Sequence, residues 1–222
     1  MKVIITGSTG MVGKGVLLEC LQSSDIDRVL IINRSSLDLQ HPKLKEILLP
    51  EFLNIATVKD DLAGYDACLY CMGTSALGKD ETSYNLITYE TTKVFADLLH
   101  DLNPNSVFIY VSGAGTDSTE KGRAMWARVK GKTENMIFQK GFKDAYAFRP
   151  GVILPEKGIK SKTSWYNISY AIMRPFFPLF KLSKNVTTTT KLGQAMMAVL
   201  KSPMSKKILY NPDINQLAEG MT

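Results

Sequence analysis

The chain has 222 residues, of which 45% are apolar, and this composition is typical of one globular domain with a buried core. The N-terminus does not combine a charged stretch with a long apolar run, so we expect no export signal and a cytoplasmic location. Three cysteines and two histidines, without acidic residues clustered around them, predict neither a disulfide framework nor a metal site.

The net charge of +6 is unevenly distributed along the chain. Residues 1–150 contain 17 Lys and Arg against 18 Asp and Glu, and residues 151–222 contain 10 against 3, which together make the 27 and 21 of the whole chain. This excess suits an anionic ligand, an acidic partner or a membrane surface, and it also suits a solvated basic face. We expect no nucleic-acid partner.

Short apolar runs alternate with segments of helical period over the first 150 residues. The predicted strands are residues 2–6, 28–33, 53–58, 66–72, 106–112 and 144–150, and the predicted helices are residues 10–22, 81–102 and 121–139. This alternation predicts an α/β fold, a doubly wound parallel sheet with helices on both faces. Residues 151–222 are expected to form a substrate-side appendage of the same single domain, with a lid region, a helix near 189–201 and a strand at 206–210.

The first predicted strand runs directly into TGSTGMVGKG at residues 6–15. Three glycines in this stretch have the spacing of a loop that holds a pyrophosphate at the start of a helix. One glycine permits the tight turn, one brings the backbone close to the phosphates, and one lets the helix pack on the strand. The strand before the loop and the apolar helix after it are the context that dinucleotide binding requires. The expected contacts are Gly7, Ser8, Thr9, Gly10, Met11, Val12 and Gly13.

The second predicted strand ends at Asn33 and Arg34, where proteins that prefer NAD usually present an acidic residue to the ribose. The guanidinium of Arg34 can pair with a 2′-phosphate, and no carboxylate stands at this position to repel it. We therefore predict that the chain binds NADP(H), with NADPH preferred over NADH, through Asn33 and Arg34. The competing interpretation is that Arg34 is an ordinary surface arginine.

Two further loops are expected to line the cofactor, one at the adenine edge after the third predicted strand and one beside the cofactor after the fourth. The residues concerned are Asp61, Leu62, Cys71, Met72 and Gly73. Cys68 and Cys71 also form a CxxC motif. We interpret this motif as packing, because residues three apart on a strand point to opposite faces.

Five motifs occur in a fixed order: TGSTGMVG, CMGTS, YVSGAG, WARVKGKTE and FRPGVIL. Together they resemble the short-chain dehydrogenase/reductase superfamily, in its atypical or extended branch, over about residues 1–155. The CMGTS, VKGKTE and FRPGVIL stretches look most like the Tat-interacting-protein group of small NADP-binding proteins. The resemblance implies a Rossmann fold and an NADP(H)-dependent oxidoreductase.

The resemblance also implies roles for single residues. In the superfamily a serine ends the fifth strand, and a Tyr-x-x-x-Lys on the next helix supplies the proton donor and a lysine. Lys130 matches that lysine, which implies contacts to the nicotinamide ribose. Ser112 is the natural match for the serine, with Gly113 as the alternative by one position. After the sixth strand, backbone contacts to the nicotinamide carboxamide are implied for Pro150, Gly151 and Val152.

The tyrosine position holds Trp126, whose indole N–H only donates and does not titrate. Three explanations are open. The protein still transfers hydride, with a proton from water, Ser112, Tyr166 or Tyr170; or the chemistry is lost and Trp126 closes the pocket; or the helix is shifted in register. We expect an oxidoreductase that reduces a small or amphiphilic carbonyl compound. The alternative is a non-catalytic NADPH-binding sensor that acts through a protein partner.

An aromatic segment at residues 164–182 is expected to form a lid over the nicotinamide end of the cleft. Arg174, Pro175 and Pro178 interrupt it, so it is too broken to span a membrane. The lysines that flank it suit an amphiphilic or anionic substrate. An interface, for example in a homodimer, and a membrane-surface patch are the alternatives.

Overall fold

A computed structural model describes residues 1–159 and 183–220 of the chain. Its main sheet has seven parallel strands in the order β3-β2-β1-β4-β5-β6-β9. These strands are β1 (Lys2–Thr6), β2 (Arg28–Asn33), β3 (Leu44–Leu48), β4 (Ala67–Tyr70), β5 (Val107–Val111), β6 (Asp144–Arg149) and β9 (Ile208–Tyr210). A second sheet pairs β7 (Val152–Leu154) with β8 (Val186–Thr188). The prediction of a parallel α/β sheet is confirmed.

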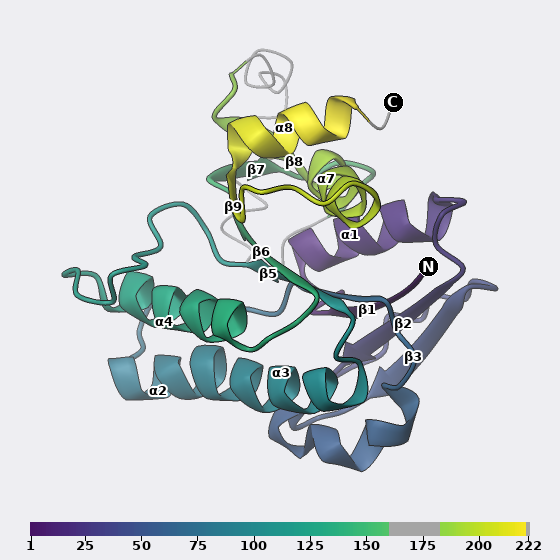
Figure 1. Cartoon of the computed structure of the whole chain (residues 1–222), viewed down its shortest axis with the longest axis horizontal. Helices are drawn as coiled ribbons and strands as arrows, with labels where there is room; N and C mark the ends of the chain where they lie inside the picture. The colour runs from purple at the N-terminus through teal and green to yellow at the C-terminus, as the bar shows by residue number, and fades with distance from the viewer. Residues whose placement is uncertain (160–182, 221–222) are drawn as a thin grey trace.

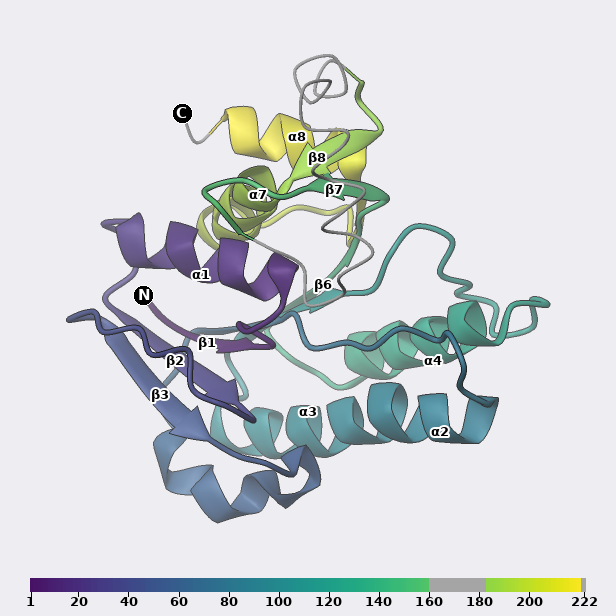
Figure 2. The same ribbon diagram turned by 180° about the vertical axis from the view of Figure 1, so that it is seen from behind.

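Helices cover both faces of the sheet, as Figures 1 and 2 show. The helices are α1 (Met11–Gln22), α2 (Glu81–Asn85), α3 (Thr91–Leu102), α4 (Met125–Gln139), α7 (Thr189–Lys201) and α8 (Asn211–Glu219). A π-helical segment, η2 (Leu86–Glu90), joins α2 to α3, and a 3-10 segment, η1 (Phe52–Asp61), packs beside α3. One face carries α1 and α7, and the other carries α3 and α4. Within the described residues, no helix is both long and apolar enough to cross a membrane.

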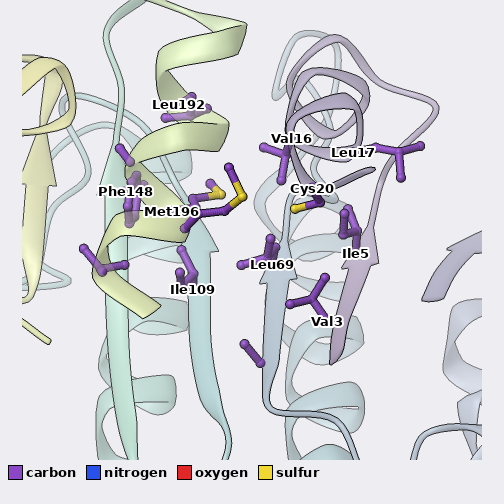
Figure 3. Packing of buried hydrophobic residues seen from close by; sticks show 14 of the residues in the cluster. Val3, Ile5, Val16, Leu17, Cys20, Leu69, Ile109, Phe148, Leu192 and Met196 are labelled. Carbon is purple, nitrogen blue, oxygen red and sulfur yellow. The ribbon is translucent and has the colours of Figure 1, made fainter. Parts of the chain in front are cut away.

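Two apolar layers flank the sheet because successive residues of a strand point to opposite faces. In β1, Val3 and Ile5 belong to the layer under α1 and α7, whereas Ile4 belongs to the layer against α3. Figure 3 shows the first layer, where Cys20 of α1 and Met196 of α7 are buried with the strand side chains. These layers fix the position of α1, and with it the loop between β1 and α1.

The two cysteines of the CxxC motif lie in different layers. Cys68 is buried in the layer against α3, and Cys71 packs against the layer under α1 and α7. Burial raises the pKa of both thiols well above the ordinary value of a cysteine. The interpretation of this motif as packing is confirmed.

The third strand differs from the prediction. Residues 53–58 were expected to form it, but they belong to η1, and the strand is β3, nine residues earlier. That strand lies at the edge of the sheet, and its residues are half-buried or exposed. A strand with one open edge needs few apolar residues, so LKEIL gives a weaker hydrophobic pattern than LNIATV. The prediction of a strand at 53–58 is therefore wrong.

The expected appendage is continuous with the sheet where the structure describes it. Strand β9 extends the sheet beside β6, α7 packs along α1, and α8 packs on α7. Lys157, just after β7, forms an ion pair with Glu19 of α1. The predicted lid at residues 164–182, including Tyr166 and Tyr170, lies outside the described residues.

Candidate functional site

The strand order reverses between β1 and β4, and parallel sheets bind their ligands at the carboxyl ends of the strands at such a point. The glycine loop between β1 and α1 lies there. Gly7 has a positive φ of 70°, and a Cβ on it would lie 2.7 Å from the carbonyl oxygen of Cys71. A Cβ on Gly13 would lie 2.3 Å from the carbonyl oxygen of Gly7. No other residue fits either position without moving the loop.

The rest of the loop leaves the start of α1 accessible. Gly10 is the N-cap of α1, and a Cβ on it would meet only the carbonyl oxygen of Gly7, at 3.3 Å. The first amides of a helix have no partner within the helix and carry the positive end of its dipole. Met11 and Val12 are half-buried in the first turn, and Val12 packs against the layer under α1. This arrangement fits a phosphate group.

The loop after β4 runs past the glycine loop. The amide of Met72 donates to the hydroxyl of Thr6 at 3.4 Å, and Cys71 lies against Gly7. A Cβ on Gly73 would meet no atom within 4 Å, so the backbone there faces open space. Cys71, Met72 and Gly73 therefore lie at the switch point of the sheet.

Asp61 and Leu62 do not lie at the carboxyl ends of the strands, and the prediction that they face the adenine is wrong. Asp61 pairs with Lys45 at 2.6 Å and lines a surface pocket together with Lys2 and Arg28, the first residues of β1 and β2. Leu62 is fully buried in the core. Both residues lie at the amino ends of the strands, because the chain crosses back through η1 before entering β4. Residues 49–50 are the ones that follow β3. They were not predicted at the site because the strand was expected at residues 53–58.

Ser8 and Asn33 turn their side chains inward. The hydroxyl of Ser8 donates to Oδ1 of Asn33 at 2.8 Å, and Nδ2 of Asn33 donates to Oε1 of Glu46 at 2.8 Å. Both residues are buried, so their side chains are not available to a ligand. Arg34, the next residue, is exposed and has no hydrogen bond or ion pair with any residue that the structure describes. Glu46 itself was not predicted.

Lys130 points toward the carboxyl end of β5. Its ammonium donates to the carbonyl oxygen of Ser112, and the residue is half-buried. Burial lowers the pKa of Lys130, and the negative charge of Glu134 opposes this shift without cancelling it. Lys130 is therefore held at the sheet and does not extend into solvent.

The structure decides between the two candidate positions for the serine. The hydroxyl of Ser112 donates to Oε1 of Glu134 at 2.5 Å, and Ser112 is only 5% exposed. Gly113 instead faces the lysine: a Cβ on it would lie 3.7 Å from Nζ of Lys130. Gly113 also has a positive φ of 144°, which side chains disfavour. Ser112 thus lies beneath the site, and the expectation that its hydroxyl polarises a substrate is corrected.

A buried ion pair supports this arrangement. Nε of Arg149 lies 3.0 Å from Oε1 of Glu134, and Nη2 lies 2.5 Å from Oε2, with the two side chains 6% and 0% exposed. Arg149 also donates to the hydroxyls of Ser118 and Tyr210. Arg149 thus holds Glu134, Glu134 holds the hydroxyl of Ser112, and the carbonyl of Ser112 holds Lys130.

Trp126 lies one turn before Lys130 on α4. Its Cη2 atom lies 3.1 Å from the position of a Cβ on Gly115, so the ring packs on the turn after β5. Among the described residues, nothing forms a hydrogen bond with its indole N–H. The tyrosine position is thus filled by a half-buried aromatic ring that contributes no titratable group.

The segment after β6 is held by hydrogen bonds to Asn211, a residue that was not predicted from the sequence. The carbonyl oxygen of Pro150 accepts from the amide of Ala114 at 2.9 Å, and the amide of Gly151 donates to Oδ1 of Asn211 at 3.1 Å. Nδ2 of Asn211 donates in turn to the carbonyl oxygen of Val152 at 3.2 Å. The side chain of Val152 is 53% exposed. Pro150, Gly151 and Val152 thus follow β6 with the two carbonyls of Pro150 and Val152 and the amide of Gly151 all engaged within the protein.

The residues that the structure brings together at the carboxyl ends of the strands come from five segments of the chain. They are residues 7–13, 33–34, 71–73, Trp126 with Lys130, and 150–152. No group of three or more His, Cys, Asp or Glu residues in the described ranges is placed to hold a metal ion. The loop, the open helix end and the inward lysine together fit a dinucleotide.

Comparisons with known proteins agree with this arrangement at the level of fold. No protein-family model matches the chain. The leucinostatins biosynthesis cluster protein T of Purpureocillium lilacinum is 32% identical over 149 residues, which cover 63% of this chain and 52% of that protein. The chain thus spans about half the length of this curated relative.

Two solved structures cover nearly all of the chain. The UDP-glucuronic acid 4-epimerase of Bacillus cereus, in complex with NAD, has a TM-score of 0.68 at 14% identity and covers 95% of this chain and 76% of its own. The short-chain dehydrogenase/reductase YIR035C of Saccharomyces cerevisiae has a TM-score of 0.67 at 12% identity and covers 100% and 99%. The chain therefore has the Rossmann fold that short-chain dehydrogenases/reductases and NAD-binding epimerases share.

Proposed function

We propose that the chain is an NADP(H)-dependent oxidoreductase of the short-chain dehydrogenase type that reduces a small or amphiphilic carbonyl compound. The observation that carries this proposal is the placement of the glycine loop and the inward Lys130 at the same edge of the sheet. The bound NAD of the Bacillus cereus epimerase, on the same fold, supports a dinucleotide here. When bound, NADPH supplies a hydride.

The residues of the chain have separable tasks in this proposal. Gly7, Gly10 and Gly13 let the backbone and the start of α1 approach the pyrophosphate. Lys130 binds the nicotinamide ribose and is, among the described residues, the titratable group nearest to Gly113, so its Nζ is the atom that holds a proton beside the substrate. Trp126 excludes water from the same corner of the site.

Arg34 is proposed to select NADPH by pairing with the 2′-phosphate. Because a charge-assisted hydrogen bond to an ionised partner contributes about 1.5–3 kcal/mol, Arg34→Ala should weaken NADPH binding by about 10- to 100-fold. The affinity for NADH should change by less than about twofold, because NADH lacks the phosphate. Titration calorimetry with both nucleotides measures this. Equal losses for both nucleotides would show that Arg34 does not recognise the 2′-phosphate.

Lys130 is expected to lower the stability of the folded protein while it contributes to nucleotide binding. Because burial lowers its pKa, the charged form is disfavoured in the folded state, and folding gains stability as the pH rises from the lowered pKa toward 10.5. At neutral pH, Lys130→Met should therefore raise the melting temperature while it weakens nucleotide binding. Calorimetric melting and nucleotide titration check the two effects. A variant with a lower melting temperature and unchanged binding would remove Lys130 from the site.

A non-catalytic NADPH-binding regulator is the second candidate. Two observations favour it: Trp126 contributes no titratable group, and the hydroxyl of Ser112 is committed to Glu134. An enzyme should oxidise NADPH with some member of an aldehyde, ketone and quinone panel. A regulator should leave NADPH intact with every member and should change its oligomeric state or its affinity for a partner between NADP and NADPH.

A further inference from the structure

One carboxylate, that of Glu46 in β3, binds the loop that follows β2 and, through Asn33, is linked to the loop that follows β1. Its Oε1 accepts from Nδ2 of Asn33 at 2.8 Å and from the amide of Leu37 at 3.1 Å. Its Oε2 accepts from the hydroxyl of Ser36 at 2.7 Å. Asn33 in turn accepts from the hydroxyl of Ser8 in the glycine loop, at 2.8 Å. Both oxygens of Glu46 are thus engaged by donors from a five-residue segment.

Glu46 is ionised at neutral pH in this position. Its partial burial acts to raise the pKa of the carboxyl, but the hydrogen bonds from Asn33, Ser36 and Leu37 outweigh burial and leave that pKa lowered. Hydrogen bonds to an ionised acceptor are about twice as strong as neutral ones. The segment 33–37 is therefore fastened at three points by a charged group that belongs to a different strand.

Arg34 lies within this fastened segment, between Asn33 and Ser36. Its own side chain is exposed and has no hydrogen bond or ion pair with any described residue. The backbone on either side of Arg34 sets the direction of its side chain. Glu46 fixes that backbone through its hydrogen bonds to the 33–37 segment. Holding a loop in its binding conformation removes part of the conformational entropy that is otherwise lost when the ligand binds.

We propose that Glu46 is a positioning residue that determines nucleotide selectivity: it holds the 33–37 segment so that Arg34 meets a ribose 2′-phosphate. This inference rests on the proposed function. A carboxylate close to a phosphate would by charge alone weaken the binding of that phosphate. Positioning and repulsion therefore predict opposite effects when Glu46 is removed, which makes the role testable.

The experiment measures the affinities of four ligands by titration calorimetry: NADPH, NADH, adenosine 2′,5′-bisphosphate and adenosine 5′-monophosphate. In each pair, the members differ at the 2′-phosphate. Glu46→Ala should weaken NADPH and the bisphosphate by about tenfold and leave NADH and the monophosphate within about twofold. Glu46→Gln, which keeps an acceptor oxygen, should restore part of the loss. Asp61→Ala is the matched control. It removes a negative charge at the amino ends of the strands, away from the glycine loop, and should change none of the four affinities.

A double-mutant cycle isolates the link to Arg34. Arg34→Ala should weaken NADPH binding in the wild-type background and cost little in the Glu46→Ala background, since the guanidinium is no longer held in place there. Equal losses for phosphorylated and unphosphorylated ligands would overturn the inference and make Glu46 merely structural. Tighter NADPH binding in Glu46→Ala would overturn it in favour of repulsion. A wild-type chain that binds none of the four ligands would instead overturn the proposed function, and the inference with it.

Discussion

Glu134→Ala is expected to destabilise the protein by about 3–5 kcal/mol, because it leaves the guanidinium of Arg149 buried without its counter-charge. The same substitution removes the shorter of the two hydrogen bonds of the Ser112 hydroxyl and leaves only the one to the carbonyl oxygen of Phe148, at 3.3 Å. Urea unfolding measures the change as a shift of the transition midpoint with an unchanged slope. This is a large fraction of the stability of an ordinary domain.

The control for this prediction is a second ion pair with one member on α4. Arg128 pairs with Glu81 at 2.6 Å, but the two side chains are 26% and 51% exposed. Glu81→Ala should therefore cost only about 0–1 kcal/mol. Replacing Glu134 and Arg149 together by methionine should cost less than the sum of the single changes, since neither charge is then left alone. If Glu134→Ala cost no more than Glu81→Ala, the buried pair would not support the site as described.

Gly13→Ala should abolish nucleotide binding within the measurable range, a loss of at least about 100-fold. The new Cβ would lie 2.3 Å from the carbonyl oxygen of Gly7, so either α1 or the glycine loop must move. Either movement displaces the amides that approach the phosphates, and overpacking of this kind also costs about 1–3 kcal/mol of stability. Titration with NADPH and thermal melting separate the two effects.

Gly220→Ala is the matched control for Gly13→Ala. A Cβ on Gly220 would lie 3.6 Å from the carbonyl oxygen of Leu217, an ordinary contact, and Gly220 lies at the end of α8. This variant should bind NADPH like the wild type. Full NADPH affinity in Gly13→Ala would mean that the loop does not hold the pyrophosphate.

Local patterns made part of the fold and site predictable from the sequence. The apolar run before TGSTG predicts β1, the glycines predict the tight loop, and the helical period after them predicts α1. These local signals agree with one another and with the observed fold. Lys130 was also predictable, since it lies four residues after Trp126 on α4 and matches the lysine of the Tyr-x-x-x-Lys pattern that the resemblance implies. The remainder of the site depends on contacts between distant segments, which no local pattern records.

Three errors illustrate this limit. An edge strand needs little apolar surface, so the third strand was predicted at residues 53–58 and not at β3. Asp61 was therefore expected at the carboxyl ends of the strands, whereas it lies at their amino ends. A shift of one residue at the end of a strand reverses the direction of the side chain, so Ser112 and Gly113 could be distinguished only in three dimensions. Asn211 fastens Gly151 across 60 positions of the chain, and the sequence offered no signal for it.

The central claim is that a reduced nicotinamide nucleotide binds with its reactive end beside Trp126 and Lys130. The chain has two tryptophans, so Trp165→Phe leaves Trp126 as the single indole. Its fluorescence, measured in this variant during titration with NADPH, tests the claim most directly. We predict saturable quenching with energy transfer to the dihydronicotinamide, at lower concentrations for NADPH than for NADH. Unchanged fluorescence with both nucleotides would contradict the account.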